Sequence, residues 1–176
     1  FLASILTDTE EKTLWCINQA AKSMDSRPCG ARLIGVHLEG PFLASAYKGA
    51  MPEALLIKSD LTLFKKYQEA AGGHIKYITV SPEVEGVPEM IPDLVSLGVV
   101  VALGHSGADY ETTMTCIKNG ANASTHTFNA MKLIHQHAPA ISGAALESDI
   151  YCEAICDGRH LHPGIVRLLL KTKGLG

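Results

Sequence analysis

The feature that most constrains the fold is a pattern that recurs along the chain: a short apolar run, a turn, and then an amphipathic helix. The apolar runs that we expect to be strands cover residues 2–6, 32–38, 75–80, 99–103, 122–128 and 150–156. Strands that alternate with helices, without tight hairpin turns, favour a parallel sheet. Doubly wound sheets and eight-unit (β/α)8 barrels share this pattern. The sequence therefore predicts the α/β class with about six βα units.

The expected helices lie between these strands. The first helix ends at Met24, and Thr7 and Asp8 are its capping candidates. The second covers 60–71 with Ser59 as its cap, and the others cover 88–97, 109–119 and 163–171. Two stretches, 39–58 and 129–143, contain glycine and proline or lack helical periodicity, and we expect them to be irregular.

Charge, hydropathy and cysteine content exclude several classes of function. The formal net charge is −3, so nucleic acid is not an expected partner. No apolar run approaches the roughly 20 residues of a membrane span. Five irregularly spaced cysteines indicate reduced thiols in a cytoplasmic protein, with Cys152 and Cys156 as buried thiols. The first residue is Phe1 rather than methionine, which indicates a fragment or a processed chain.

Polar side chains stand at the ends of four of the six expected strands. They are Glu39 in "HLEGP", His105 in "LGHSG", His126 in "THTFNA", and Asp157 with His160 in "CDGRH". A single histidine at a strand end is more often structural than a ligand. In a barrel, however, the carboxyl ends of successive strands face one common site. An open sheet would spread them out, with roughly 4.8 Å between adjacent strands.

Two histidines and one carboxylate form a ligand set that catalytic zinc and related divalent ions use. Such an ion makes water a nucleophile and polarises a carbonyl group, which suits hydrolysis of an amide or ester. A proton acceptor is also needed. Asp157 is a candidate by residue type, but Asp-Gly is typical of a turn. His37 lies on the same side of its strand as Glu39, and we expect a supporting or packing role for it.

Four segments resemble the N-acetylglucosamine-6-phosphate deacetylases of the amidohydrolase superfamily. They are "GVHLEGPFLASAYKGAMPEALL", "VVVALGHSGADYE", "ASTHTFNAM" and "YCEAICDGRHLHPGIVRLLLKTKG". These motifs stand in the family's order, and the likeness runs over essentially the whole chain. The resemblance implies a metal-dependent (β/α)8 barrel, of which residues 1–176 form one incomplete domain, roughly strands two to seven. It also implies hydrolysis of the acetamide of N-acetylglucosamine 6-phosphate to glucosamine 6-phosphate and acetate. The open edges of an incomplete barrel predict association, and we expect a homodimer.

The same resemblance implies roles for individual residues. Glu39, His105 and His126 match the metal ligands of one divalent ion, with zinc expected and iron, cobalt or manganese as alternatives. The residues that match substrate contacts are Ala50, Met51, Asn129, Ala130, His137 and His160. The family's general-base aspartate is expected beyond residue 176. No catalytic residue is therefore assigned within the chain, which alone is expected to be inactive or nearly so.

The chain departs from the family in the loop that usually reads "HHREPG". Here it reads "HQHAPA", so His137 stands where an arginine binds phosphate. Arginine grips phosphate with two parallel hydrogen bonds and stays charged, whereas histidine is mostly neutral at pH 7. Two alternatives stay open. One is a deacetylase or amidohydrolase of the same fold for another sugar or an unphosphorylated amide. The other is a catalytically incompetent domain that binds a sugar or a partner.

Overall fold

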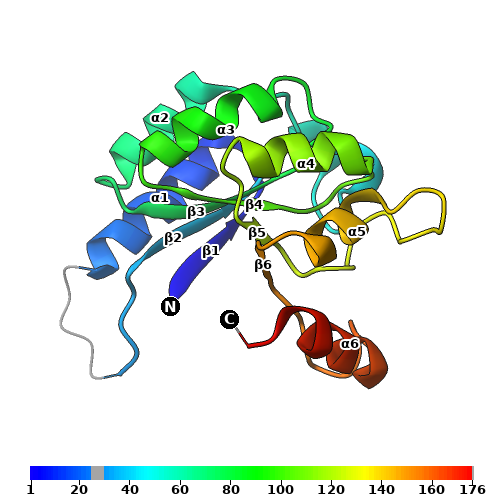
Figure 1. Ribbon diagram of the computed structural model, residues 1–176. Helices are drawn as coiled ribbons and strands as arrows, with labels where there is room; N and C mark the ends of the chain where they lie inside the picture. The colour runs from blue at the N-terminus through cyan, green and yellow to red at the C-terminus, as the bar shows by residue number, and fades with distance from the viewer. Residues whose placement is uncertain (25–29, 176) are drawn as a thin grey trace.

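The computed structural model shows one parallel sheet whose spatial order follows the sequence, β1-β2-β3-β4-β5-β6 (Figure 1). The structure describes residues 1–24 and 30–175. The strands are β1 (Leu2–Leu6), β2 (Gly35–Glu39), β3 (Ile75–Val80), β4 (Val100–Leu103), β5 (Ala123–Ser124) and β6 (Tyr151–Cys152). A doubly wound sheet reverses its strand order at a switch point, whereas a barrel adds each strand beside the last. The sequential order confirms the predicted α/β class and fits part of a barrel.

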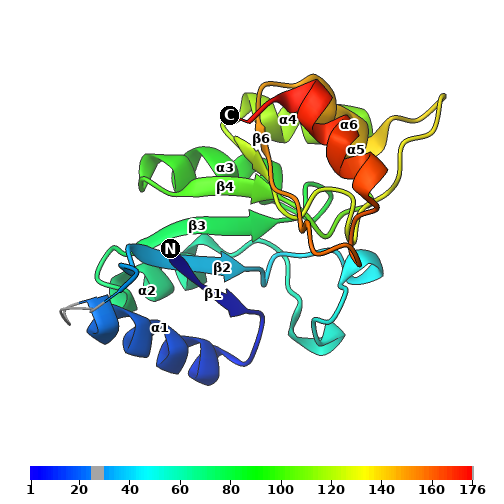
Figure 2. The ribbon, with the colours of Figure 1, turned by 90° about the horizontal axis from the view of Figure 1, so that it is seen from below.

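Each strand is followed by one α-helix, which gives the expected number of six βα units, although one of the helices was not predicted. The helices are α1 (Glu10–Met24), α2 (Leu61–Ala70), α3 (Val87–Ser96), α4 (Tyr110–Lys118), α5 (Ala140–Glu147) and α6 (Pro163–Lys173). Helices α1 to α4 lie over one face of the sheet (Figure 1), and Figure 2 looks onto the other face. Among the described residues, no helix is long and apolar enough to cross a membrane.

The core lies between the sheet and these helices. Alternate side chains of the central strands point into it. The buried side chains of these strands include Val36, Leu38, Ile78, Val80, Val101 and Leu103. Phe64 of α2 and Ile91 of α3 are fully buried against them. Burying each large apolar side chain stabilises the fold by about 1.5–3 kcal/mol, so this layer fixes the strands that carry the polar residues described below.

The opposite face of the sheet is polar and carries a row of hydrogen bonds that crosses the strands. His37 on β2 lies in the middle of this row. Its Nδ1 lies 3.1 Å from Ser4 Oγ on β1, and its Nε2 lies 2.8 Å from Thr79 Oγ1 on β3. Thr79 Oγ1 in turn lies 2.7 Å from Thr125 Oγ1. His37 therefore has two hydrogen-bonding partners of its own, in agreement with the predicted supporting role.

Strand β5 is much shorter than the predicted strand over 122–128. Only Ala123–Ser124 pair with a neighbouring strand. The backbone leaves the strand because His126 and Phe128 have φ angles of 33° and 78°. These values lie in the left-handed region, which does not continue a pleated strand. The prediction failed here because the sequence "THTF" has high strand propensity, whereas the structure uses it as a turn.

Strands β2 and β6 are also shorter than predicted. Strand β2 begins at Gly35 rather than at residue 32. Strand β6 pairs only over Tyr151–Cys152 instead of 150–156. Beyond it the chain reaches a turn in which Asp157 Oδ1 accepts a backbone hydrogen bond. The Asp-Gly pair is thus part of a turn, as predicted.

Helix α5 was not predicted, because residues 129–143 were expected to be irregular. The helix begins within that stretch and extends to Glu147. Gly143, the end of the stretch that was expected to be irregular, lies inside the helix. A Cβ at this position would lie 2.4 Å from the Cβ of Pro139. Glycine is therefore required by a close approach and does not end the helix.

Two capping predictions were wrong. Asp60, rather than Ser59, caps α2, and its Oδ1 accepts a hydrogen bond from the Leu63 amide at 2.9 Å. Thr7, predicted to cap α1, instead donates its hydroxyl proton to the Glu39 carbonyl at 2.8 Å. This hydrogen bond joins the end of β1 to the end of β2.

The cysteines of the described residues are free thiols. Cys116 is buried, Cys16 and Cys152 are half-buried, and Cys156 is exposed. The prediction of a buried thiol is wrong for Cys156, because it lies beyond the end of β6 rather than within a strand. Cys29 lies outside the described residues.

Candidate metal centre

Glu39 ends β2, and its backbone is held from both neighbouring strands. Thr7 donates to its carbonyl from the β1 side, and the Gly40 amide donates to the Thr79 carbonyl at 3.1 Å on the β3 side. Gly40 has a φ of 86°, and a Cβ there would lie 2.3 Å from Thr7 Oγ1. Only glycine fits this turn without displacing Thr7. The Glu39 side chain therefore starts from a fixed point at the carboxyl end of its strand.

His105 follows β4 and is 5% exposed. Its backbone is left-handed, with a φ of 49°. Ser81 Oγ lies 2.7 Å from the His105 carbonyl oxygen and stabilises this unusual conformation. On the ring, Nδ1 lies 2.8 Å from the Tyr47 carbonyl oxygen. A carbonyl only accepts hydrogen bonds, so Nδ1 carries the proton and Nε2 presents its lone pair to Glu39.

His126 lies just beyond β5, in the left-handed turn that ends the strand. Its Nε2 lies 3.1 Å from Glu39 Oε1 and 3.1 Å from His105 Nε2, while His105 Nε2 lies 3.0 Å from the same carboxylate oxygen. The Nδ1 atom of His126 is buried and has no hydrogen-bond partner among the described residues. Two imidazoles and one carboxylate thus direct their atoms at a common point.

The donor set of this cluster fits a divalent metal ion. Its three ligand atoms all lie within 4.8 Å of one another, and no other group of this kind is found in the part of the chain that the structure describes. Two imidazole Nε2 atoms that face each other at 3.1 Å cannot both carry a proton between them. A cation relieves this convergence of lone pairs. Two histidines and one carboxylate are a ligand set of catalytic zinc, and imidazole also suits iron and copper.

The electrostatics of the cluster also favour a cation. Burial raises the pKa of Glu39, but its close contacts with the His105 and His126 rings outweigh burial and bring the pKa to about 2. Burial lowers the pKa of His126, but its hydrogen bond to Glu39 outweighs this and the pKa is raised. Glu39 is therefore an anion throughout the physiological pH range, and it stabilises positive charge between the two rings.

Two of the predicted substrate-contact residues, Asn129 and Ala130, lie in the turn beside His126. The Asn129 amide donates to the His126 carbonyl at 2.9 Å. The Ala130 carbonyl accepts from the Ser106 amide, next to His105, at 3.0 Å. The turn therefore connects the segments that carry the two histidines.

Ala50 and Met51 lie in the loop between β2 and α2, which also approaches His105. Ala50 is exposed, whereas Met51 is 5% exposed. A Cβ on the preceding residue, Gly49, would lie 3.2 Å from His105 Cε1. The structure thus brings the residue that precedes this pair against the ring of His105.

His160 lies beyond β6 and is exposed. Its Nδ1 pairs with Asp157 Oδ2 at 2.8 Å, and its amide donates to Asp157 Oδ1 at 2.9 Å. Backbone hydrogen bonds from His160 and Arg159, together with the His160 side chain, lower the pKa of Asp157 to about 2. A carboxylate with so low a pKa is a poor proton acceptor at neutral pH, which supports its interpretation as a turn residue.

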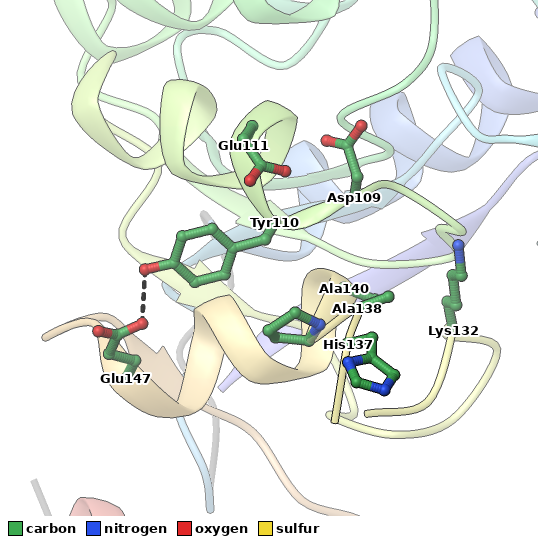
Figure 3. A pocket seen from close by; sticks show the side chains of 9 residues that line it. Asp109, Tyr110, Glu111, Lys132, His137, Ala138, Ala140 and Glu147 are labelled. Atoms are coloured by element: carbon green, nitrogen blue, oxygen red, sulfur yellow. Dashed lines mark hydrogen bonds between the residues drawn. The ribbon is translucent and has the colours of Figure 1, made fainter. Parts of the chain in front are cut away.

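The structure does not bring His137 to the cluster. It lines a separate pocket of about 300 Å³, shown in Figure 3, together with Lys132 and residues of α4 and α5. In this pocket the Tyr110 hydroxyl donates to Glu147 Oε2 at 2.5 Å. None of the three metal-ligand candidates lines the pocket.

Three residues that hold the cluster were missed in the sequence. Tyr47 acts through its backbone carbonyl, which leaves no trace in the residue type. Glu83 is exposed and accepts hydrogen bonds from the segment after His105. Ser81 directly follows the apolar run of β3. A polar residue at a strand end was a signal that could have identified Ser81, because the same rule found Glu39 and His105.

Known proteins resemble the chain over nearly its whole length, although no protein-family model matches it. N-acetylglucosamine-6-phosphate deacetylase of Bacillus subtilis is 36% identical over 99% of this chain and 45% of the relative. N-acetylgalactosamine-6-phosphate deacetylase of Shewanella sp. is 35% identical over 98% of this chain and 43% of the relative. The chain thus spans less than half the length of these curated relatives.

Solved structures give the same result for the fold. The crystal structure of N-acetyl-D-glucosamine-6-phosphate deacetylase from Mycobacterium smegmatis superimposes with a TM-score of 0.93 at 33% identity, covering 99% of this chain and 45% of that one. An aspartate-to-alanine variant of that enzyme, in complex with N-acetyl-D-glucosamine-6-phosphate, gives a TM-score of 0.92 over 97% of this chain and 44% of that one. In sequence and in fold, the chain belongs to the N-acetylglucosamine-6-phosphate deacetylase family and spans a little under half of its matched members.

Proposed function

We propose that the chain carries the metal centre of a hydrolase that removes acetate from N-acetylglucosamine 6-phosphate and leaves glucosamine 6-phosphate. The observation that carries this proposal is the convergence of Glu39, His105 and His126, whose ligand atoms lie within 4.8 Å of one another. The three residues come from the carboxyl ends of different parallel strands, where barrel enzymes hold their active sites. The names of the relatives agree with this chemistry.

We further propose that the ion is a single zinc, with iron, cobalt or manganese as alternatives. When bound, zinc supplies Lewis acidity toward an amide carbonyl and makes water nucleophilic near neutral pH. Glu39 contributes the negative charge that holds the cation. His105 contributes a neutral imidazole whose Nε2 is free, because the proton on Nδ1 is directed at the Tyr47 carbonyl. His126 completes the set from the turn after β5.

Four of the six proposed substrate contacts lie in segments next to this cluster, whereas His137 lines a separate pocket. Asn129 and Ala130 adjoin His126, and Ala50 and Met51 adjoin the loop that covers His105. These residues are proposed to line the sugar and phosphate positions. His160 is proposed to contact the sugar, and its pairing with Asp157 orients the ring for this role. His137 is proposed to contribute a weaker phosphate contact than an arginine would.

A second substrate, N-acetylgalactosamine 6-phosphate, is favoured by two observations. A relative with that name is 35% identical to the chain. The loop that contains His137 also lacks the arginine of the family pattern. An unphosphorylated amide is the third alternative, because a neutral histidine places no charge requirement on the substrate.

Metal analysis of the purified chain tests whether the proposed centre binds a metal ion. We expect about one equivalent of zinc per chain after loading at pH ~7.5, measured by elemental analysis after gel filtration. Absence of bound metal would contradict the proposed function and favour a domain that only binds a sugar or a partner. The chain alone is expected to release little or no acetate, because none of its residues is assigned as the proton acceptor. Acetate release by the chain alone at a rate near that of a complete relative would contradict this expectation.

A hybrid enzyme tests the activity and the substrate. The chain would replace the matching segment of the Bacillus subtilis relative, and acetate release would be measured with the 6-phosphates of both N-acetylated sugars and with the unphosphorylated sugars. We expect N-acetylglucosamine 6-phosphate to be the preferred substrate and Glu39→Gln to abolish the activity. A preference for another substrate would support the corresponding alternative.

We also propose that the chain forms a homodimer in the cytoplasm. Strands β1 and β6 lie at the two edges of the sheet, and the exposed Tyr151 of β6 lies on one of them. Open strand edges favour association. Light scattering is expected to give twice the mass of the chain, and a monodisperse monomer would contradict the dimer.

A further inference from the structure

The loop between β2 and α2 covers the ring of His105. The Tyr47 carbonyl oxygen lies 2.8 Å from His105 Nδ1. Two residues later the backbone of Gly49 passes so close that a Cβ there would lie 3.2 Å from His105 Cε1. One edge of the imidazole is therefore in contact with this loop, while its opposite nitrogen faces Glu39 and His126.

The position of Tyr47 depends on its aromatic ring. The ring packs directly on the backbone of Gly107, where a Cβ would lie 2.3 Å from Tyr47 Cε2. Gly107 is two residues after His105. Tyr47 thus contacts the segment that follows β4 twice, once through its carbonyl at the His105 imidazole and once through its ring at Gly107. Any side chain at position 107 would displace the ring.

Glu83, in the loop after β3, holds the other side of this contact. Its Oε1 accepts from the Gly107 amide at 2.6 Å, and its Oε2 accepts from the Ser106 hydroxyl at 2.7 Å. Both carboxylate oxygens therefore fix the backbone on which the Tyr47 ring rests. Hydrogen bonds to an ionised acceptor are stronger than neutral ones, so this anchor is firm even though Glu83 is exposed.

We propose that Tyr47 is a positioning residue for His105: its ring, packed on Gly107, holds its carbonyl where it fixes the proton of His105 on Nδ1. The free Nε2 lone pair then faces Glu39 and His126. This inference rests on the proposed metal centre. A hydrogen bond to the second ring nitrogen orients metal-binding histidines in general, and its loss typically costs 10–100-fold in metal affinity.

The tyrosine hydroxyl has no part in this role, since it makes no hydrogen bond to the residues that the structure describes. Tyr47→Phe therefore keeps the ring and serves as the matched control. Tyr47→Leu and Tyr47→Ala remove the aromatic contact to different extents, and Gly107→Ala displaces the ring without changing Tyr47. Each variant is checked for folding by circular dichroism before binding is measured.

The first measurement is zinc affinity of the 176-residue chain by competition with a chromophoric chelator, with the visible spectrum of the cobalt(II) form as a second reading of ligand geometry. We expect Tyr47→Phe to match the wild type. Tyr47→Ala, Tyr47→Leu and Gly107→Ala are expected to bind zinc about 10–100-fold more weakly and to change the cobalt spectrum. Equal zinc affinities for all variants, or equal losses for the Phe and Ala variants, would overturn the inference.

The second measurement needs no metal. Side-chain ¹⁵N shifts of His105 in the metal-free chain report which ring nitrogen carries the proton. We expect the Nδ1–H form in the wild type and in Tyr47→Phe, and a mixture of forms in Tyr47→Ala and Gly107→Ala. If the wild-type chain binds no zinc, the proposed function fails, yet these shifts still decide the role of Tyr47. An unchanged form in Tyr47→Ala and Gly107→Ala would refute it.

Discussion

The Nε2 atoms of His105 and His126 lie 3.1 Å apart, although one follows β4 and the other lies in the turn after β5. Both also lie within hydrogen-bonding distance of the same oxygen of Glu39. Three groups that would repel or compete for protons are thus held together by a rigid sheet. Such an arrangement costs free energy unless a cation neutralises it, and this makes the cluster sensitive to substitution and to pH.

Glu39→Gln is expected to weaken zinc binding by more than about 100-fold. Residues that only support a metal ligand cost up to about 100-fold when they are substituted, and Glu39 is proposed to be a ligand itself. The amide keeps the shape of the side chain but removes the negative charge that balances the cation. Chelator competition on the purified chain measures the change. Glu69→Gln, on the exposed side of α2, is the matched control and should bind as the wild type does. Comparable binding by the Glu39 variant would mean that the cluster is not the zinc site.

Zinc affinity is expected to fall as the pH decreases through the raised pKa of His126, which lies above its ordinary value of 6.5. The ligand must be neutral to bind zinc, so a proton on His126 competes with the metal. Glu39, with a pKa of about 2, does not compete in this range. Titrations at pH values of about 6, 7 and 8 test this order. An affinity that is independent of pH would contradict it.

In the metal-free chain, protonation of His126 stabilises the fold, whereas in the zinc-bound chain it competes with the metal. A raised folded-state pKa stabilises the fold at pH values below 6.5, and this contribution is lost as the pH rises through the folded-state pKa of His126. The stabilisation that zinc adds in denaturant unfolding should therefore shrink as the pH falls through the pKa of His126. A stabilisation by zinc that is the same at every pH would show that zinc and the proton do not share His126.

The sequence alone was sufficient to predict the parallel sheet and the strand ends whose Glu39, His105 and His126 side chains the structure brings together. Strand ends with Glu39, His105 and His126 could be found because a parallel barrel brings its carboxyl ends to one side, whatever the details of the helices. The supporting contacts could not be found in the same way. Tyr47 acts through a carbonyl that every residue possesses, and its ring finds Gly107 only after three loops have folded together.

The errors in the elements have a similar cause. The turn at His126 was predicted as a strand because its neighbours are β-branched, and the left-handed backbone that overrides this propensity depends on tertiary contacts. Helix α5 was missed because residues 129–143 were expected to be irregular. The contact of Gly143 with Pro139 is visible only in the folded chain. Local propensity is a weak guide where close packing decides the backbone.

Ile78→Ala is expected to destabilise the chain by about 2–5 kcal/mol, because it leaves a cavity in the layer between β3 and the helices. Ile78 is fully buried. Trp15→Ala removes a larger side chain, but Trp15 is 63% exposed, and its loss is expected to cost no more than about 0.5 kcal/mol. Urea unfolding of both variants measures the difference. A larger effect for Trp15 would mean that this face of α1 is covered in solution.

His37→Phe is expected to destabilise the chain by about 1–3 kcal/mol near neutral pH, because it removes both hydrogen bonds at the centre of the polar row. Burial lowers the pKa of His37, against the opposing pull of Glu153 and Glu39. The unfolded chain therefore binds the His37 proton more readily, and the stability that His37 contributes declines as the pH falls below 6.5.

The difference in unfolding free energy between the wild type and His37→Phe should consequently shrink as the pH falls from about 7.5 to about 5.5. His126 is present in both proteins, so its opposite pH effect largely cancels in this difference. Ser4→Ala is the control, because Ser4 is exposed and its substitution removes only the outer hydrogen bond of the row. Its difference from the wild type should be small and nearly constant with pH. A constant difference for His37→Phe would mean that the histidine is not held neutral between Ser4 and Thr79.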